Sequence, residues 1–146
     1  MAAPLQYCTF FVDGQCCGLD VARVQEIICA QPMTPVPLAP DVVCGLINLR
    51  GQIVTAIDLR RRLGMKERPA EQPPINVVVQ TDDGACSLLV DEIGDVLEAP
   101  ENAFERPPET LADPAKVMIR GAYKLKDCLL LILDADEVVR LDIAEG

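Results

Sequence analysis

The fold of this chain is decided by the stretch Gly45-Leu46-Ile47-Asn48-Leu49-Arg50-Gly51-Gln52-Ile53-Val54-Thr55-Ala56-Ile57-Asp58-Leu59-Arg60. Two apolar segments that favour β-structure flank Arg50-Gly51, where glycine allows the tight turn of a hairpin. Asp58 follows the second segment, and its carboxylate can accept hydrogen bonds from free N–H groups in the first turn of a helix. The stretch therefore predicts a β-hairpin with a charged tip, followed directly by a short helix that stops at Gly64.

The pattern recurs in the second half of the chain at an offset of 76 residues, which aligns Gly45 with Gly121 and Asp58 with Asp134. The second copy also reads as a strand, a charged turn, a strand and an Asp-capped helix. Glu137, three positions after Asp134, completes the pattern of a capping box. The repeat predicts two similar structural units.

The two copies differ at the hairpin tip, where Lys126-Asp127 replaces Arg50-Gly51. The second copy keeps the scaffold positions although it has neither arginine nor glycine at the tip. The fold therefore does not require Arg50-Gly51, whose arginine carries a planar guanidinium group. We therefore place the functional hypothesis on the tip of the first copy and interpret the second copy as scaffold.

A charged partner for the tip is available in Val24-Gln25-Glu26-Ile27-Ile28, which reads as a strand. Glu26 could pair with Arg50 across a barrel and orient the guanidinium for a partner protein. The alternative is that Glu26 faces solvent on an edge strand. Arg50 would then be a solvated turn residue whose stem covers apolar surface.

Short apolar runs with a period of two, bounded by turn residues, predict a mainly β fold. Ten short strands favour small barrels over a sandwich of long strands. We expect two β-barrels of about five strands each, with short helices after the first copy's hairpin and at the C-terminus. The expected strands are Leu5–Val12, Gln15–Leu19, Val24–Cys29, Cys44–Leu49, Gln52–Ile57, Ile75–Thr81, Ala85–Val90, Asp95–Ala99, Val117–Leu125 and Cys128–Leu133.

The 146 residues suit a single domain. The proline-marked stretch Lys66–Pro74 divides it into near-equal halves, so we expect approximate subdomains 1–66 and 67–146. The N-terminal strand and the C-terminal helix are free to cross over between them. Leu129–Leu133 is apolar on both faces and is expected at the contact between the barrels.

The net charge of −10 opposes binding to nucleic acid or to a phospholipid surface. No apolar run is long enough to span a membrane, and the N-terminus lacks a signal-peptide pattern, so we expect a soluble cytoplasmic protein. The basic residues gather at Arg60, Arg61, Arg62, Lys66 and Arg68. This basic cluster is either a solvated helix face followed by a loop or a patch that meets an acidic partner.

Residues for catalysis or metal binding are scarce, because the chain has no histidine and Ser87 is its only serine. The seven cysteines contain no C-x-x-C pair and are interpreted as reduced, structural thiols. Asp58 and Asp134 could be paired catalytic aspartates, but each precedes a helix and is better explained as a cap. We expect no cofactor and no metal; a carboxylate- or thiol-dependent enzyme is the alternative from a different class.

At these residues the chain resembles the CheW family of bacterial chemotaxis coupling proteins over nearly its whole length. The resemblance is carried by Gly45-x-x-Asn48-Leu49-Arg50-Gly51, by Val24-Gln25-Glu26-Ile27 before it, and by Leu130–Asp134 after it. It implies two five-stranded SH3-like barrels and no catalysis. The implied role is an adaptor that is monomeric when free and joins a receptor array. An adaptor of another chemosensory system, such as twitching motility, is the alternative.

The resemblance also implies partners, namely the cytoplasmic tip of methyl-accepting chemoreceptors and the regulatory domain of the histidine kinase CheA. The receptor tip is expected in the groove between the barrels. The implied receptor-binding residues are Arg50, Gly51, Glu26, Val24, Ile27 and Val96, and the implied kinase-binding residues are Gly45, Leu46 and Asn48.

Overall fold

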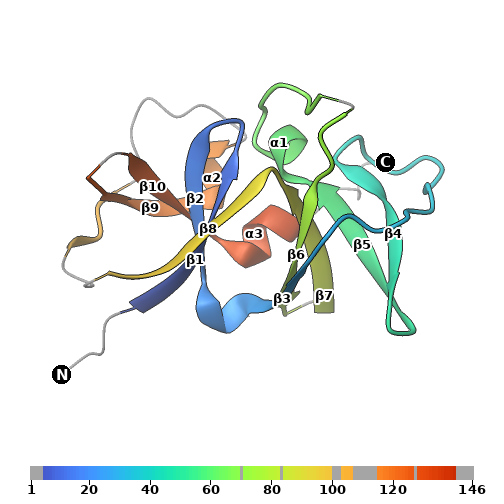
Figure 1. Ribbon diagram of the computed structural model, residues 1–146, viewed down its shortest axis with the longest axis horizontal. Coiled ribbons are helices and arrows are strands. Elements are labelled where there is room, and N and C mark those ends of the chain that lie inside the picture. The colour runs from blue at the N-terminus through green and yellow to red at the C-terminus, as the bar shows by residue number, and fades with distance from the viewer. Residues whose placement is uncertain are drawn as a thin grey trace.

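The computed structural model describes residues 5–69, 71–82, 84–99, 103–106, 115–126 and 128–140. Within these residues the chain forms two five-stranded sheets and a few short helices, which confirms the mainly β prediction (Figure 1). The elements are β1 (Leu5–Val12), β2 (Gln15–Asp20), the 3-10 turn η1 (Val21–Arg23), β3 (Val24–Ile28), β4 (Val43–Leu49), β5 (Gln52–Asp58), α1 (Leu59–Arg62), β6 (Ile75–Thr81), β7 (Gly84–Val90), β8 (Glu92–Ala99), α2 (Ala115–Met118), β9 (Ile119–Lys124), β10 (Leu129–Leu133) and α3 (Ala135–Val139).

Two expected strands differ by more than one residue at their starts. The strand expected over Val117–Leu125 begins only at Ile119, because Ala115–Met118 form a helical turn. Met118 is fully buried there, and its carbonyl accepts a hydrogen bond from the Asp134 backbone N–H at 2.8 Å. The strand expected from Asp95 begins earlier, at Glu92, since pairing with β1 holds its polar first residues in the sheet.

The strands pair in the orders β8-β1-β2-β10-β9 and β3-β6-β7-β5-β4, here called sheet A and sheet B. Each sheet therefore joins a hairpin from one half of the chain to three strands from the other half. The copies remain equivalent, because Leu131 of β10 pairs in parallel with Cys17 while Thr55 of β5 pairs in parallel with Cys86. The two halves exchange their hairpins.

This exchange means that a division between residues 66 and 67 does not separate the sheets. The reason lies in the short links after each hairpin. Asp91 alone separates β7 from β8, and one residue is too short for the two-residue turn that would fold β8 back beside β7. β8 instead runs on into sheet A and pairs with β1.

Three apolar clusters form among the described residues. One lies within sheet A around Tyr7 and Leu130, and one within sheet B around Ile47 and Val54. The largest cluster draws residues from both sheets, so it joins the two units into one hydrophobic core. β10 contributes to two clusters, as expected for a strand that is apolar on both faces. Leu130 and Ile132 face the cluster of sheet A, while Leu131 and Leu133 face the largest one, here called the central cluster.

Gly45 and Gly121 are repeated for a steric reason. A Cβ on Gly45 would lie 2.7 Å from the carbonyl oxygen of Thr34, whose segment forms a β-bridge with Leu46. A Cβ on Gly121 would lie 2.5 Å from the carbonyl oxygen of Glu105, the residue bridged to the neighbour of Gly121. Both copies thus need glycine where an extended segment crosses the hairpin.

No helix in the described part of the chain is long and apolar enough to cross a membrane.

We predict that Gly45→Ala lowers the free energy of unfolding by about 1–3 kcal/mol, because the added methyl group overpacks a backbone contact. Urea unfolding measures the loss. Gly18→Ala is the control, since the nearest atoms to its Cβ would be terminal methyl groups of Ile132 and Leu130 at 3.2 Å, with the Tyr7 Cβ at an ordinary 3.5 Å. An equal or larger loss for Gly18→Ala would contradict the steric explanation.

Candidate functional site

The tip of the β4–β5 hairpin is a two-residue turn between Leu49 and Gln52, which face each other in the sheet register. Arg50 and Gly51 both adopt positive φ, at 53° and 87°. Two positive φ values give the turn the twist that matches its strands, and glycine takes such a value without the strain that an arginine bears. The Asn48 side-chain oxygen accepts a hydrogen bond from the Gly51 N–H at 2.8 Å and stabilises the turn.

Arg50 and Glu26 form a two-pronged ion pair, which confirms the predicted partnership. The Arg50 Nη1 and Nη2 atoms donate to the Glu26 Oε2 and Oε1 atoms at 2.8 and 2.7 Å. The Arg50 side chain is 75% exposed, whereas that of Glu26 is 17% exposed. β3 and β4 are the two end strands of sheet B, so this pair bridges its open edges. The geometry holds a guanidinium in one orientation while most of its surface faces solvent.

The apolar candidates differ in exposure. Val24 is half-buried and packs against the central cluster, whereas Ile27 is 41% and Val96 57% exposed. Ile27 pairs with Val77 on β6, and Val96 pairs with Cys8 on β1. Val96 follows Ile27 by 69 residues, and Val77 follows Cys8 by the same number. The two exposed residues are therefore equivalent positions on the end strands of different sheets. The structure brings Arg50 and Glu26 together and places Val96 on the other sheet.

Among the kinase-binding candidates, Gly45 is buried and is explained by its contact with Thr34. Leu46 is half-buried and Asn48 is exposed, and both lie on the outer face of the hairpin. Ile53 pairs with Asn48 on this face and is 60% exposed. Our site prediction missed Ile53, although the alternation along β5 could have placed it facing outward.

The basic cluster is not a free surface. Arg60 is buried, and its Nε and Nη2 atoms donate to the carboxylate of Asp91, at distances of 2.6–3.1 Å. Arg68 donates from Nε to the same carboxylate at 3.0 Å. The backbone N–H of Asp13, in the β1–β2 turn, donates to it at 2.7 Å. One carboxylate thus joins α1, the loop after it and a hairpin of the other sheet.

Arg62 belongs to a second internal contact. Its Nε atom donates to the carbonyl of Val138 at 2.8 Å, and its Nη2 atom donates to those of Glu137 and Arg140 at 2.9 and 2.7 Å. These carbonyls lie at the end of α3, where helix carbonyls run out of regular partners, and among the described residues only the Glu137 carbonyl has a backbone partner, the Arg140 N–H at 3.3 Å. Arg60, Arg62 and Arg68 therefore belong neither to a solvated helix face nor to a patch for an acidic partner. Their guanidinium groups make hydrogen bonds within the protein.

Both aspartates that precede helices are caps. Asp58 Oδ1 accepts a hydrogen bond from the Arg60 N–H at 3.0 Å. Asp134 Oδ1 accepts from the N–H groups of Asp136 and Glu137 at 3.1 and 3.2 Å. Their backbone contacts are equivalent as well. The Asp58 N–H donates to the Val42 carbonyl and the Asp134 N–H to the Met118 carbonyl, and each acceptor directly precedes the first strand of its hairpin. The carboxylates therefore have a structural use that explains their repetition.

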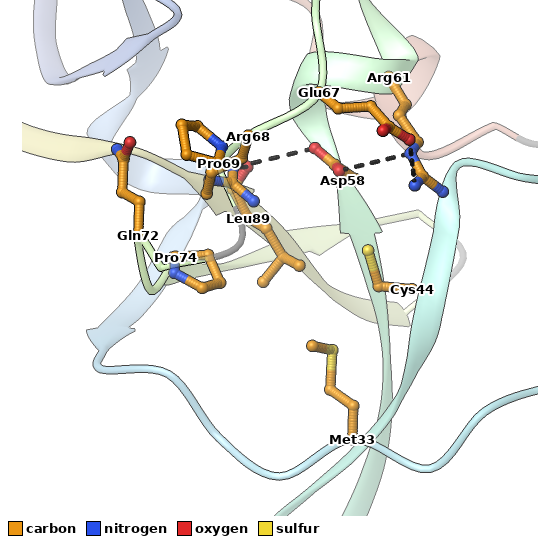
Figure 2. A pocket seen from close by; sticks show the side chains of 10 residues that line it. All are labelled: Met33, Cys44, Asp58, Arg61, Glu67, Arg68, Pro69, Gln72, Pro74 and Leu89. Carbon is orange, nitrogen blue, oxygen red and sulfur yellow. Dashed lines mark hydrogen bonds and ion pairs between the residues drawn. The ribbon is translucent and has the colours of Figure 1, made fainter.

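A pocket of about 260 Å³ lies beside Asp58 (Figure 2). Arg61 and Arg68 enter it together with Asp58 and Glu67, and the four charges pair with one another. No unpaired charge among these four residues is left to bind a substrate. In the described ranges no group of three or more Cys, Asp or Glu side chains is arranged to hold a metal ion.

Comparison with known proteins identifies the family. The sequence model of the CheW-like domain family matches residues 6–142. The chain belongs to this family. Chemotaxis protein CheW of Bacillus subtilis is 33% identical over 130 residues, covering 89% of this chain and 83% of that protein. CheW of Thermotoga maritima is 30% identical and covers 94% of this chain and 90% of that protein.

A solved structure agrees with the sequence comparisons. The scaffolding protein TtCheW of Thermoanaerobacter tengcongensis superposes with a TM-score of 0.86 at 27% identity, covering 97% of this chain and 92% of that one. CheW proteins are non-catalytic scaffold adaptors of chemotaxis signalling, and this CheW-like protein is an adaptor and not an enzyme.

Asp91 is the electrostatic centre of this CheW-like protein. Burial by itself would raise the pKa of the Asp91 carboxyl, but the hydrogen bonds from Arg60, the Asp13 N–H and Arg68 outweigh it. The pKa is therefore held below the ordinary value for aspartate. A carboxylate with several charged donors stays ionised in a buried place.

We predict that Asp91→Asn lowers the free energy of unfolding by about 3–5 kcal/mol, because Arg60 and Arg68 would lose the charged acceptor that both bind and keep only the more distant Asp13 and Asp58, at 3.7 and 3.8 Å. Urea unfolding near neutral pH measures this loss. Glu67→Gln is the matched control, since it breaks a pair with Arg61 at an exposed site and should cost less than about 1 kcal/mol. Similar losses for both variants would show that burial of the Asp91 pair is unimportant.

The same carboxylate predicts an acid-sensitive contribution to stability. A carboxyl whose pKa is lowered by folding stabilises the protein fully above its unfolded pKa, about 3.9 for aspartate, and loses this effect as the pH falls further. The stability difference between the wild type and Asp91→Asn should therefore shrink below about pH 4. Thermal unfolding from pH 6 to pH 3 measures it, and a constant difference would contradict the role assigned to Asp91.

Proposed function

We propose that the protein couples the cytoplasmic tip of methyl-accepting chemoreceptors to the regulatory domain of the histidine kinase CheA. It would act in the cytoplasm, recruited to membrane receptor arrays. The observation that carries the proposal is the Arg50–Glu26 ion pair, which presents an exposed guanidinium on a hairpin tip that the internal repeat does not require.

The receptor-binding surface consists of Arg50, Gly51, Glu26, Ile27, Val24 and Val96. Glu26 holds the guanidinium before binding, so less side-chain entropy is lost when a partner carboxylate or carbonyl meets it. Ile27 follows Glu26 on β3 and exposes an apolar side chain on the opposite face of this end strand. An amphipathic helical tip lying along the strand edge would meet both, with acceptors toward Arg50 and apolar residues toward Ile27. Val96 is the equivalent apolar position of the other sheet and would contact a tip that lies between the sheets.

The kinase-binding surface is the outer face of the β4–β5 hairpin, with Gly45, Leu46, Asn48 and Ile53. Ile53 gives it an exposed apolar centre, which is the type of residue that contributes binding energy when a partner excludes water from it. Gly45 acts indirectly, by letting the Thr34 segment cross the hairpin. Asn48 holds the turn that carries Arg50, so the two surfaces share one hairpin.

Arg50→Ala should weaken binding of a purified receptor cytoplasmic fragment about tenfold or more, as expected for an arginine that dominates an interface. Arg50→Lys should be intermediate, since it keeps the charge and loses the fork. Isothermal titration calorimetry measures the affinity. Lys126→Ala is the matched control, because Lys126 is an exposed cation at the equivalent tip of sheet A.

The fold should survive this change, since exposed ion pairs contribute at most about 1 kcal/mol. Unchanged receptor binding by Arg50→Ala, or equal weakening by Lys126→Ala, would exclude the tip as the receptor contact. A loss of stability as large as that of a core truncation would show that Arg50 is structural instead.

Ile53→Asn tests the kinase surface. We expect weaker binding to the isolated CheA regulatory domain and unchanged binding to the receptor fragment, because Ile53 lies with Leu46 and Asn48 on the outer face of the hairpin, outside the proposed receptor surface. Co-purification with each partner separates the two effects. If the wild-type protein bound neither partner at micromolar concentration, the coupling role would be refuted.

A further inference from the structure

Two cysteines from opposite ends of the chain meet in sheet A. In the parallel pairing of β2 with β10, Cys17 lies opposite Leu131, which places Cys16 beside Leu130. Cys16 and Leu130 share the apolar cluster of sheet A. Cys128 lies just before β10 begins, and its carbonyl accepts a hydrogen bond from the Leu125 N–H that extends the pairing of β9 with β10 by one residue pair. It precedes Leu130 by two positions, and residues two apart in such a ladder face the same side of a sheet. Cys128 is thus a diagonal neighbour of Cys16 on the same face.

Further contacts hold this arrangement. The Gln15 side chain donates to the carbonyl of Leu129 at 2.9 Å, and the Leu125 N–H donates to the carbonyl of Cys128 at 2.8 Å. The first bond attaches the start of β2 to the start of β10, and the second closes the turn that carries Cys128. Burial, followed by the nearby thiol of Cys128, raises the pKa of Cys16 to about 12.

The two thiols differ in access. Cys16 is buried, whereas Cys128 is exposed. The first attack on an oxidant in solution therefore falls to Cys128, and Cys16 is the neighbour positioned to respond. Cys17 is not a competitor, since it faces the central cluster on the other side of the sheet.

We propose that Cys16 and Cys128 are an oxidation site at which a hydroperoxide produces a reversible disulfide. The Cys128 thiolate attacks a peroxide oxygen, the O–O bond breaks, and a sulfenic acid forms as the first water leaves. The Cys16 sulfur then gives up its proton and attacks the Cys128 sulfur. An S–S bond forms, the S–O bond breaks, and a second water leaves.

The balance is two thiols and one hydrogen peroxide giving one disulfide and two waters, with two electrons passing from sulfur to oxygen. A dithiol reductant reverses the reaction by thiol–disulfide exchange. The cross-link would attach β2 to the start of β10. It would therefore lock the exchanged N-terminal hairpin onto strands from the C-terminal half.

The test uses the full-length reduced protein and hydrogen peroxide, followed by alkylation of free thiols. The expected wild-type product has lost two hydrogen atoms and yields one linked peptide pair, of which one contains Cys128, after digestion without reductant. Cys16→Ala and Cys128→Ser should each abolish the link, whereas Cys17→Ala should keep it. Cys29→Ser is the matched control at the other exposed cysteine and should also keep it.

Stability gives a second readout. The oxidised wild type should melt at a higher temperature than the reduced form, because the bond restricts the unfolded chain, and dithiothreitol should reverse the shift. Cys128→Ser, an exposed change, keeps the test valid even if Cys16→Ala does not fold. The proposal is overturned if wild type gains no intramolecular link, or if the link persists in Cys128→Ser.

Discussion

The buried carboxylate of Asp91 is the interaction on which this architecture depends. It occupies the single position between β7 of sheet B and β8 of sheet A, where the chain leaves one sheet for the other. Arg60 comes to it from α1, Arg68 from the following loop, and the Asp13 N–H from the β1–β2 turn. A charge at this position is tolerated only because so many donors surround it. The crossing point of the chain is thereby also its most polar buried point.

Around this centre the protein is nearly symmetric, and function is expected where the symmetry fails. The glycines, the capping aspartates and the parallel pairings all occur twice, because each is required wherever a hairpin meets a crossing segment and a helix. The Arg50–Glu26 pair occurs once in this form. Asp127, the residue that takes the place of Gly51, lies outside the described residues. An adaptor needs distinct surfaces for distinct partners, and changing the tip of one copy supplies one at little cost to the scaffold.

Local patterns predicted local structure well. Alternation of apolar residues located the strands, and the Asp58 and Asp134 caps followed from the chemistry of free N–H groups. The Arg50–Glu26 partnership was also within reach, because opposite charges stood on a predicted tip and a predicted strand. The role of Asp91 could not be predicted, since a buried carboxylate and an exposed one look alike in sequence. The helical turn before Ile119 was missed because Val117 and Met118 are apolar in either conformation.

The exchange of hairpins was beyond sequence reasoning for a related reason. Pairings such as Cys17 with Leu131 join residues far apart in the chain, and nothing local selects them over pairings within one half. The one-residue link at Asp91 was hidden as well, because the strand after it was expected to begin only at Asp95 and begins at Glu92. The burial of Arg60 and Arg62 depends on the same distant contacts, so their cluster looked like surface.

The exchanged order of strands also bears on how the chain acquires its structure. β1 pairs with β8, and β2 with β10, so sheet A contains the first strands and the last ones. Contacts between distant residues slow folding, because the intervening chain must lose entropy before it gains stabilising contacts. During synthesis the N-terminal hairpin therefore waits for β10 to leave the ribosome. The free edge of β2 stays unpaired until β10 has been made, whereas the edge of β1 waits only for β8.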